Sequence, residues 1–374
     1  MPEASGKFSR QDRAYMARAL KLALGGRYST RPNPRVGCVL VNEGRIVGEG
    51  FHYRAGEDHA EAAALKLAGS AAHGATAYVT LEPCAHQGRT PPCARGLIEA
   101  GVARVVYAAG DPNPRVAGGG AQLLRTAGIT CEGGLLADEA RAQNRGFLMR
   151  CERGRPFVTL KLGMSLDARV ALADGSSQWI TSAEARADVQ RLRASSCAVL
   201  TGSGTVLADD PGLDVRDPRF DLGGHPPGRI ILDSALRTPP GARILTPPGQ
   251  VWIFCAEGAE RDRAERLRAR GAQVETLPRA ASGLDLPILL KRLAALEIND
   301  LMVESGPALA ANLLGAGLVD ELVLYVAPLL LGPDARAAFA WPALHSLAEA
   351  PHMAVVEVAR VGVDQRLVLR PGSP

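Results

Sequence analysis

Three potential metal ligands and one acidic side chain restrict the fold of this chain more than any other feature of its sequence. The imidazole belongs to His59, the two thiols to Cys84 and Cys93, and the carboxylate to Glu61. Two thiolates and one imidazole satisfy Zn²⁺ and leave its fourth coordination position open, which is the arrangement of catalytic rather than structural zinc. The chain must therefore fold so that three separate segments meet at one point.

The spacing of His59 and Glu61 predicts where a helix begins. Two residues apart in the middle of a helix, their side chains would point to nearly opposite sides. We therefore expect both residues in the first turn of a helix over residues 60–67, where the entering loop sets the direction of the side chains. Asp58, just before them, is the expected N-cap residue.

Both cysteines are expected at the ends of secondary-structure elements. Cys84 follows an apolar run over residues 76–81 that predicts a buried strand, and Cys93 opens the next predicted helix. Helix N-termini favour the thiolate form that zinc requires. A structural zinc site, with His86 as a fourth protein ligand, is the alternative that these residues leave open.

The order of these residues matches H-x-E…P-C-x-x-C, the signature of zinc deaminases that act on nucleobases. In such a site zinc lowers the pKa of a bound water, and Glu61 would carry the proton from that water to the departing amine. The match has one departure, because eight residues (85–92) separate the two cysteines where the signature has two.

Strand and helix patterns alternate along the whole chain and predict an α/β fold with a largely parallel sheet. A hairpin is expected over residues 36–50, and a second alternation begins at residue 157. The chain has 374 residues, of which 47% are hydrophobic, so it can form two cores. We expect one domain over residues 1–148 and a second over residues 149–374.

Composition argues against several classes of function. Only 4% of the residues are aromatic, so a platform for stacking single-stranded nucleic acid is poorly supplied. The net charge of +4 is spread along the chain, which suits a small phosphorylated substrate better than a polynucleotide. The seven cysteines are scattered, no apolar run reaches the length of a membrane span, and the N-terminus lacks a signal-peptide core. We therefore predict a cytoplasmic protein that binds neither nucleic acid nor a membrane.

Two glycine-containing turns in the second half are candidate sites for a dinucleotide phosphate. Residues 201–205, Thr-Gly-Ser-Gly-Thr, follow a predicted strand, but the third glycine of the Rossmann fingerprint is missing. Residues 303–307, Val-Glu-Ser-Gly-Pro, join a strand to a helix whose first N–H groups can hold a phosphate. Taken alone, the second motif is explained more simply as an ordinary turn between strand and helix.

Longer motifs in the first half resemble the bifunctional deaminase–reductases of riboflavin biosynthesis, which share the eight-residue separation of the cysteines. These motifs lie at residues 30–38, 59–61, 80–84, 86–93 and 111–114. The resemblance implies a cytidine-deaminase-like α/β/α sandwich that holds one zinc ion. The implied reaction is hydrolytic deamination of 2,5-diamino-6-(5-phosphoribosylamino)pyrimidin-4(3H)-one to 5-amino-6-(5-phosphoribosylamino)uracil. The residues that the resemblance assigns to this substrate are Asn33, His52, His86 and Arg89.

The second half resembles the reductase half of the same enzymes, with matching motifs at residues 161–169, 177–181, 204–211 and 304–307. The resemblance implies a dihydrofolate-reductase-like α/β domain that uses NADPH to reduce the ribosyl group, giving 5-amino-6-(5-phosphoribitylamino)uracil. The residues that it assigns to the cofactor are Gly163, Ser177, Trp179, Thr205, Asp209, Ser234, Gly306, Pro307, Ala308, Leu309, Ala310, Ala311 and Asn312. Those that it assigns to the substrate are Arg193, Leu213, Arg216 and Glu304.

The chemistry of some of these side chains fits the assigned reaction. A guanidinium matches phosphate bidentately, so Arg193 and Arg216 suit a 5′-phosphate. Lys161 and Asp209 are candidates for assisting proton transfer. The chain departs from the family pattern at Ala168, where glycine is common. The same resemblance implies a homo-oligomer, either a dimer or a tetramer.

Two other functions fit part of the sequence. A nucleic-acid-editing zinc deaminase with an accessory domain would need a basic, aromatic face, which the composition does not favour. A zinc-stabilised nucleotide-binding or regulatory protein would need the metal but no catalysis. Zinc retention together with loss of deamination in a Glu61→Gln protein would separate the enzyme from this last class.

Overall fold

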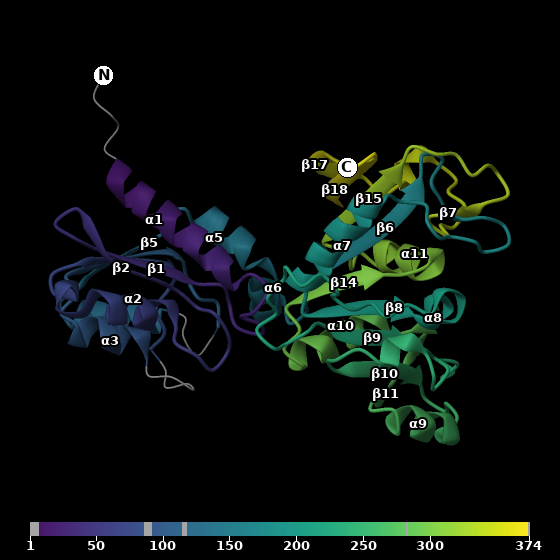
Figure 1. Ribbon diagram of the computed structural model, residues 1–374, viewed down its shortest axis with the longest axis horizontal. Helices are drawn as coiled ribbons and strands as arrows, with labels where there is room; N and C mark the ends of the chain where they lie inside the picture. The colour runs from purple at the N-terminus through teal and green to yellow at the C-terminus, as the bar shows by residue number, and fades with distance from the viewer. Residues whose placement is uncertain (1–6, 86–91, 114–117, 282, 373–374) are drawn as a thin grey trace. The chain divides into compact units, whose positions relative to one another are not determined.

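The computed structural model describes residues 7–85, 92–113, 118–281 and 283–372. The chain divides into two units, Met1–Gly154 and Arg155–Pro374 (Figure 1). The boundary expected from the sequence, between residues 148 and 149, falls inside α6 (Arg145–Arg153), the last helix of the first unit. Of the described helices, none is both long and apolar enough to cross a lipid bilayer.

The first unit is built on a five-stranded sheet in the order β2-β1-β3-β4-β5. Strand β1 pairs antiparallel with β2 and with β3, whereas β3, β4 and β5 run parallel. The prediction of a largely parallel sheet is therefore correct only from β3 onward, because the hairpin adds two antiparallel pairs. The strands are β1 (Gly37–Asn42), β2 (Arg45–Phe51), β3 (Thr76–Leu81), β4 (Arg104–Ala109) and β5 (Thr130–Gly133).

Helices cover both faces of this sheet, and the expected α/β/α sandwich is confirmed. Successive strand residues point to opposite faces. Leu40 and Val79 belong to the core beneath α2, α3 and α4, whereas Val39 and Tyr78 belong to the core beneath α1, α5 and α6. The remaining helices are α1 (Arg10–Ala23), α2 (Ala60–Ala68), α3 (Cys93–Glu99), α4 (Gly119–Thr126) and α5 (Ala137–Gln143).

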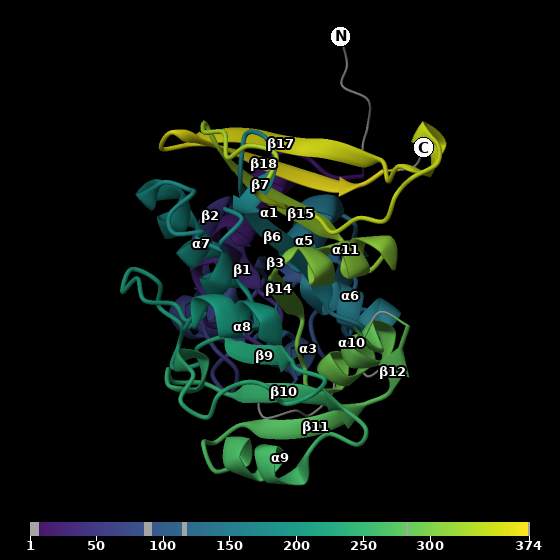
Figure 2. The same cartoon turned by 90° about the vertical axis from the view of Figure 1, so that its right-hand side faces the viewer.

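The second unit is built on a nine-stranded sheet in the order β11-β10-β9-β8-β14-β6-β15-β18-β17 (Figure 2). Its strands run parallel from β11 to β15, and β18 and β17 complete the sheet as an antiparallel hairpin. The strands are β6 (Phe157–Ser165), β8 (Ala198–Gly202), β9 (Gly228–Leu232), β10 (Val251–Ala256), β11 (Gln273–Leu277), β14 (Asp300–Glu304), β15 (Glu321–Ala327), β17 (Met353–Val361) and β18 (Asp364–Pro371).

Helices lie on both faces of this sheet as well, which parallel strands require because their crossover connections run over the faces. One core includes side chains of α10 and α11, and the other includes side chains of α7, α8 and α9. Parallel β6, β8, β9 and β14 end at a common edge, where ligands bind in folds of this kind. The helices are α7 (Ala183–Ser195), α8 (Ser203–Asp209), α9 (Arg261–Arg268), α10 (Leu286–Ala295) and α11 (Pro307–Gly315).

The turn between β6 and β7 (Arg169–Ala171) contains the residue that departs from the family pattern. Ala168 has a φ of 57°, in the left-handed region that costs alanine more free energy than glycine. We therefore expect Ala168→Gly to raise the free energy of unfolding by roughly 0.5–1 kcal/mol, measured by thermal or denaturant unfolding. In contrast, Ala173→Gly, at a position outside that region, should lower the stability. A loss of stability in the Ala168→Gly protein would contradict the expectation.

Candidate active sites

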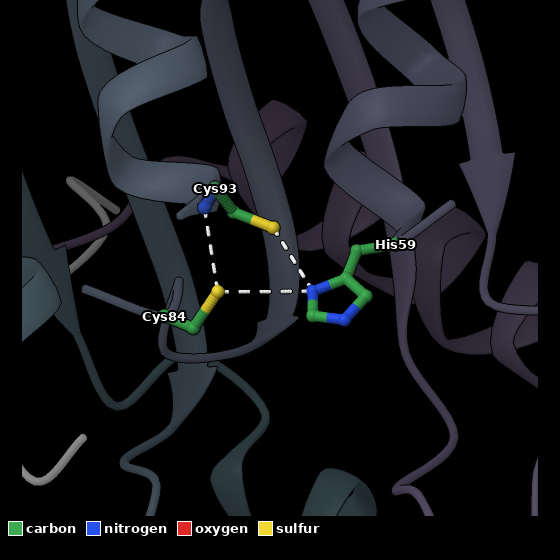
Figure 3. Close-up of side chains that lie close together, drawn as sticks. All are labelled: His59, Cys84 and Cys93. Atoms are coloured by element: carbon green, nitrogen blue, oxygen red, sulfur yellow. Dashed lines mark hydrogen bonds between the residues drawn. The ribbon is translucent and has the colours of Figure 1, made fainter. Parts of the chain in front are cut away.

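Three side chains from separate segments of the first unit converge (Figure 3). The Nδ1 atom of His59 lies 3.1 Å from the Cys93 sulfur and 3.7 Å from the Cys84 sulfur. The backbone N–H of Cys93, at the start of α3, donates to the Cys84 sulfur at 3.3 Å. The three possible ligand atoms lie within 4.8 Å of one another, which places them around a volume of the size of one metal ion.

The chemistry of this cluster fits zinc. Its hydrogen bond with Cys93 lowers the pKa of the Cys84 thiol to about 4 against the effect of burial, and the pKa of Cys93 is raised by the same bond. The two sulfurs face one imidazole, and the Cys84 thiol is the one that loses its proton more readily. Thiolate and neutral imidazole are the forms that bind a divalent metal ion. His86, the fourth ligand in the structural alternative, lies outside the described residues.

The start of α2 sets the direction of His59 and Glu61. The helix begins at Ala60, so the predicted first-turn position is confirmed for Glu61, and His59 immediately precedes that turn. The predicted N-cap at Asp58 is wrong: the cap residue is His59, whose imidazole faces the sulfurs and makes no capping bond. Asp58 instead forms an ion pair with Lys66, which lies in the last turn of α2.

Glu61 is a buried carboxyl group beside the metal ligands, with 4% of its surface exposed. Burial raises its pKa, and the neighbouring His59 opposes that shift. The Cys93 thiol is a hydrogen-bond partner of the carboxyl group. A carboxylate in this position can accept a proton and release it within a space that excludes bulk water.

Asn33 and His52 form a hydrogen-bonded chain that ends at the metal cluster. The carbonyl of Asp58 can only accept, so Nδ1 of His52 must carry the proton of their 2.9 Å bond. Nε2 is then an acceptor and receives the Asn33 amide N–H at 3.0 Å. Burial lowers the pKa of His52, which keeps the ring neutral, and the ring packs against His59 with centroids 5.2 Å apart. The chain orients the Asn33 amide and leaves its oxygen available to a ligand.

The residues that position Cys84 were not predicted. The buried carboxylate of Glu82 accepts the backbone N–H groups of Gly118 and Ala121, both at 3.1 Å, and so binds the first turn of α4. Gly120, in the same turn, lies against the carbonyl of Pro83, the residue before Cys84. Because a Cβ atom on Gly120 would stand 1.7 Å from the Pro83 oxygen, only glycine allows this approach.

We expect Gly120→Ala to displace Cys84 and weaken zinc binding. Backbone must move to relieve the overlap with Pro83, and a shift of the ligand loses both metal affinity and stability. The zinc content after dialysis and the unfolding temperature should both fall. Gly119→Ala is the control, because its added Cβ meets only the Ala85 side chain at 3.5 Å. Equal zinc content in the two variants would contradict the expectation.

In the second unit, a carboxylate and two cations meet at the ends of neighbouring strands. Glu304, the last residue of β14, forms two bonds with the Arg193 guanidinium, at 2.5 and 3.1 Å, and lies 3.6 Å from Lys161 of β6. Burial alone would raise the pKa of Glu304, but the two cations lower it to about 2. Arg193 is itself buried and also donates to the Asp214 carbonyl at 3.0 Å. Lys161 and Arg193 are 32 residues apart in the sequence (161 and 193), and both pair with the Glu304 carboxylate.

Most of the residues assigned to the cofactor follow the carboxyl ends of β8, β9 and β14. Thr205 lies in the first turn of α8, and its hydroxyl lies 3.8 Å from where a Cβ of Gly306, the N-cap of α11, would stand. Ser234 follows β9, and residues 307–312 form the first part of α11. The structure therefore brings these residues to the sheet edge where an extended ligand can bind.

The other assigned residues differ in their surroundings. The Ser177 hydroxyl donates to the Asp209 carboxylate at 3.3 Å. Trp179 is 67% exposed, and the Arg186 guanidinium lies 4.4 Å from its ring centre. Leu213 is buried, whereas Arg216 is exposed, with its backbone N–H donated to Gln190 at 2.8 Å. Gly163 lies in β6. Arg89, which was assigned to the deaminase substrate in the first unit, lies outside the described residues.

Comparisons with known proteins agree over both units. The family model described as the RibD C-terminal domain matches residues 156–366, and that of the cytidine and deoxycytidylate deaminase zinc-binding region matches residues 9–109. The chain is 52% identical to the riboflavin biosynthesis protein RibD of Escherichia coli K12 over 363 residues, which cover 95% of this chain and 98% of that protein. The corresponding protein of Haemophilus influenzae is 49% identical over 98% of this chain and 99% of its own length.

Two solved structures are similar along nearly the whole chain. Acinetobacter baumannii RibD, form 1, superposes with a TM-score of 0.90 at 44% identity and covers 97% of this chain and 99% of its own. A Thermotoga maritima protein, described as a diaminohydroxyphosphoribosylaminopyrimidine deaminase and 5-amino-6-(5-phosphoribosylamino)uracil reductase, superposes with a TM-score of 0.83 at 32% identity over the same shares of the two chains.

Proposed function

This chain belongs to the RibD family of riboflavin biosynthesis proteins, and on that basis we propose how it divides two reactions between its units. The protein is a bifunctional enzyme, a deaminase and a reductase of riboflavin biosynthesis. Residues 1–148 deaminate 2,5-diamino-6-(5-phosphoribosylamino)pyrimidin-4(3H)-one, and residues 149–374 reduce the ribosyl group of the product with NADPH. The observation that carries this proposal is the convergence of His59, Cys84 and Cys93 beside the buried carboxyl of Glu61.

In the deaminase unit, His59, Cys84 and Cys93 would hold one Zn²⁺, which would supply a Lewis acid that makes water nucleophilic near neutral pH. Glu61 accepts a proton from the attacking water and delivers it to the departing amine. The Asn33 amide, oriented by neutral His52, binds the pyrimidine edge, because an amide offers both a donor and an acceptor.

The ribose phosphate of the same substrate is assigned to His86 and Arg89. A guanidinium and an imidazole supply the charge and hydrogen bonds that a phosphate and a ribose need. The support for these two residues is the resemblance alone, since both lie outside the described part of the chain.

In the reductase unit, the residues at the carboxyl edge of the sheet would hold NADPH, which would supply the hydride. The residues of this chain orient it and the substrate. Arg216, which is exposed, binds the 5′-phosphate. Arg193 bonds to Glu304 and thereby holds that carboxylate toward the substrate. Lys161 lies beside Glu304, and burial lowers the pKa of its amine, which suits a group that gives up a proton.

We infer that the protein is a cytoplasmic homo-oligomer, a dimer or a tetramer. All seven cysteines are free thiols, as a reducing compartment favours. Strand β17 lies at one edge of the nine-stranded sheet (Figure 2). Val355 and Val358 on it are 59% and 60% exposed, and an exposed apolar edge strand is a surface that a second copy can cover. Light scattering on the purified protein tests the oligomeric state.

The function is tested by incubating the purified, zinc-loaded protein with the diaminopyrimidine ribosylamine phosphate, with and without NADPH. Mass spectrometry should show replacement of an amino group by oxygen without NADPH, followed by the gain of two hydrogens when NADPH is added. Absence of deamination would contradict the first half. Failure to reduce the deaminated product with NADPH would contradict the second half alone.

A further inference from the structure

The side-chain amide of Asn144 forms two hydrogen bonds with the backbone of Arg35, a loop residue that is distant in the sequence. Its amide oxygen accepts the backbone N–H of Arg35 at 2.8 Å, and its amide nitrogen donates to the carbonyl of the same residue at 2.9 Å. Asn144 is 5% exposed. The amide therefore satisfies both backbone groups of Arg35 in the way that a neighbouring strand would, and it does so where water cannot replace it.

Asn144 occupies a helix-capping position, but its side chain does not cap the helix. Asn144 is the N-cap residue of α6, and asparagine is among the best N-cap residues because its oxygen can accept an N–H of the first turn. Here the side chain makes no capping bond and is directed to Arg35 instead. The Arg35 side chain strengthens the contact by donating to the Gln143 carbonyl at 2.6 Å. Two successive residues of the α5–α6 junction thus hold one residue of the loop.

A short, stiff segment connects Arg35 to the deaminase site. Asn33 lies two residues earlier, between Pro32 and Pro34, whose rings fix their φ angles. The Asn33 amide bonds to His52, and the His52 backbone N–H donates to the Val36 carbonyl at 3.0 Å. A displacement of the backbone at Arg35 must therefore move the residues on both of its sides, including the amide that is oriented toward the pyrimidine.

We propose that Asn144 is a positioning residue for deamination. It fixes the backbone at Arg35 and thereby holds the Asn33 amide in the position that binds the pyrimidine edge. Asn144 itself contacts neither substrate nor metal. The proposal rests on the role in substrate binding proposed above for Asn33. We expect a higher KM with little change in kcat, because Glu61 and the metal ligands lie on other segments and keep their geometry.

The test compares Asn144→Ala with Gln143→Ala in the full-length, zinc-loaded protein. The Gln143 side chain donates to the Leu20 carbonyl at 3.1 Å, so its removal also costs a hydrogen bond at the same junction but leaves the Arg35 backbone held. Asn144→Ala should raise the KM for deamination about tenfold, with kcat changed by less than about threefold. Zinc content and the rate of reduction should stay unchanged. Gln143→Ala should lower the unfolding temperature without raising the KM.

Asn33→Ala and the double variant decide whether the effect passes through Asn33. If it does, Asn144→Ala adds no further rise in KM to the Asn33→Ala protein, because coupled residues are non-additive. Additive effects, or equal KM values in the Asn144→Ala and Gln143→Ala proteins, would overturn the positioning role. An unchanged KM in Asn33→Ala would instead contradict the proposed function of Asn33. Should Asn144→Ala fail to fold, Asn144→Asp preserves the shape and the oxygen that accepts the Arg35 N–H, but it replaces the donor to the Arg35 carbonyl with a second oxygen. The same rise in KM is expected from that lost bond.

Discussion

Deamination should fall by about 10²- to 10⁴-fold when Glu61 is replaced by glutamine, which is the range that general acid–base catalysis contributes. Glutamine has the same shape but cannot accept and release a proton at neutral pH. The metal ligands His59, Cys84 and Cys93 are untouched, so the variant should retain its zinc. The reductase reaction, which takes place in the other unit, should proceed at the wild-type rate when the deaminated intermediate is supplied.

The control is Glu57→Gln, an identical chemical change only four residues away. The Glu57 carboxylate is 42% exposed and pairs with Arg54, so its loss should leave both activities and the zinc content unchanged. Deamination rates, bound zinc and NADPH oxidation are measured on the same three preparations. Full deaminase activity in Glu61→Gln would refute the role of this carboxylate, and loss of zinc would show that the substitution acts through the metal site instead.

The local features of the metal centre could be predicted from the sequence because short-range rules determine them. The separation of His59 and Glu61 is incompatible with mid-helix positions, and Cys84 and Cys93 follow a strand and open a helix. The N-cap prediction failed for a physical reason. Asp58 has the better capping side chain, but the helix begins one residue later so that the imidazole of His59 can face the sulfurs. A tertiary requirement overrode a local preference.

The contacts that hold each site in place could not be predicted, because they join residues distant in the sequence. Asn144 and Arg35 are 109 residues apart, and Arg193 and Glu304 are 111 apart. Strand order decides such pairs: β14 is inserted between β8 and β6, which brings Glu304 next to Lys161. The family resemblance assigned Arg193 and Glu304 separately to the substrate, but nothing in the sequence indicated that they bind each other.

Glu304→Gln should destabilise the second unit by about 3–5 kcal/mol, the usual cost of removing one partner from a buried ion pair. The substitution leaves the guanidinium of Arg193 and the ammonium of Lys161 close together without their carboxylate. For a unit of this size, the loss corresponds to a fall of roughly 6–20 °C in unfolding temperature. Reduction of the deaminated product should also fail, whereas zinc content and deamination should not change.

Glu275→Gln is the matched control, because Glu275 also bonds bidentately to an arginine, at 2.7 and 2.9 Å to Arg292. That arginine is 41% exposed, so the pair is screened by water and its loss should cost less than about 1 kcal/mol. The pH dependence separates the two carboxylates further. The pKa of Glu304 in the folded protein, about 2, lies below its ordinary value of 4.5, so its stabilisation is complete above pH 4.5 and is lost as the pH falls through about 2. The stability difference between wild type and Glu304→Gln should therefore narrow over that interval. A constant difference would show that packing, rather than charge, makes Glu304 necessary.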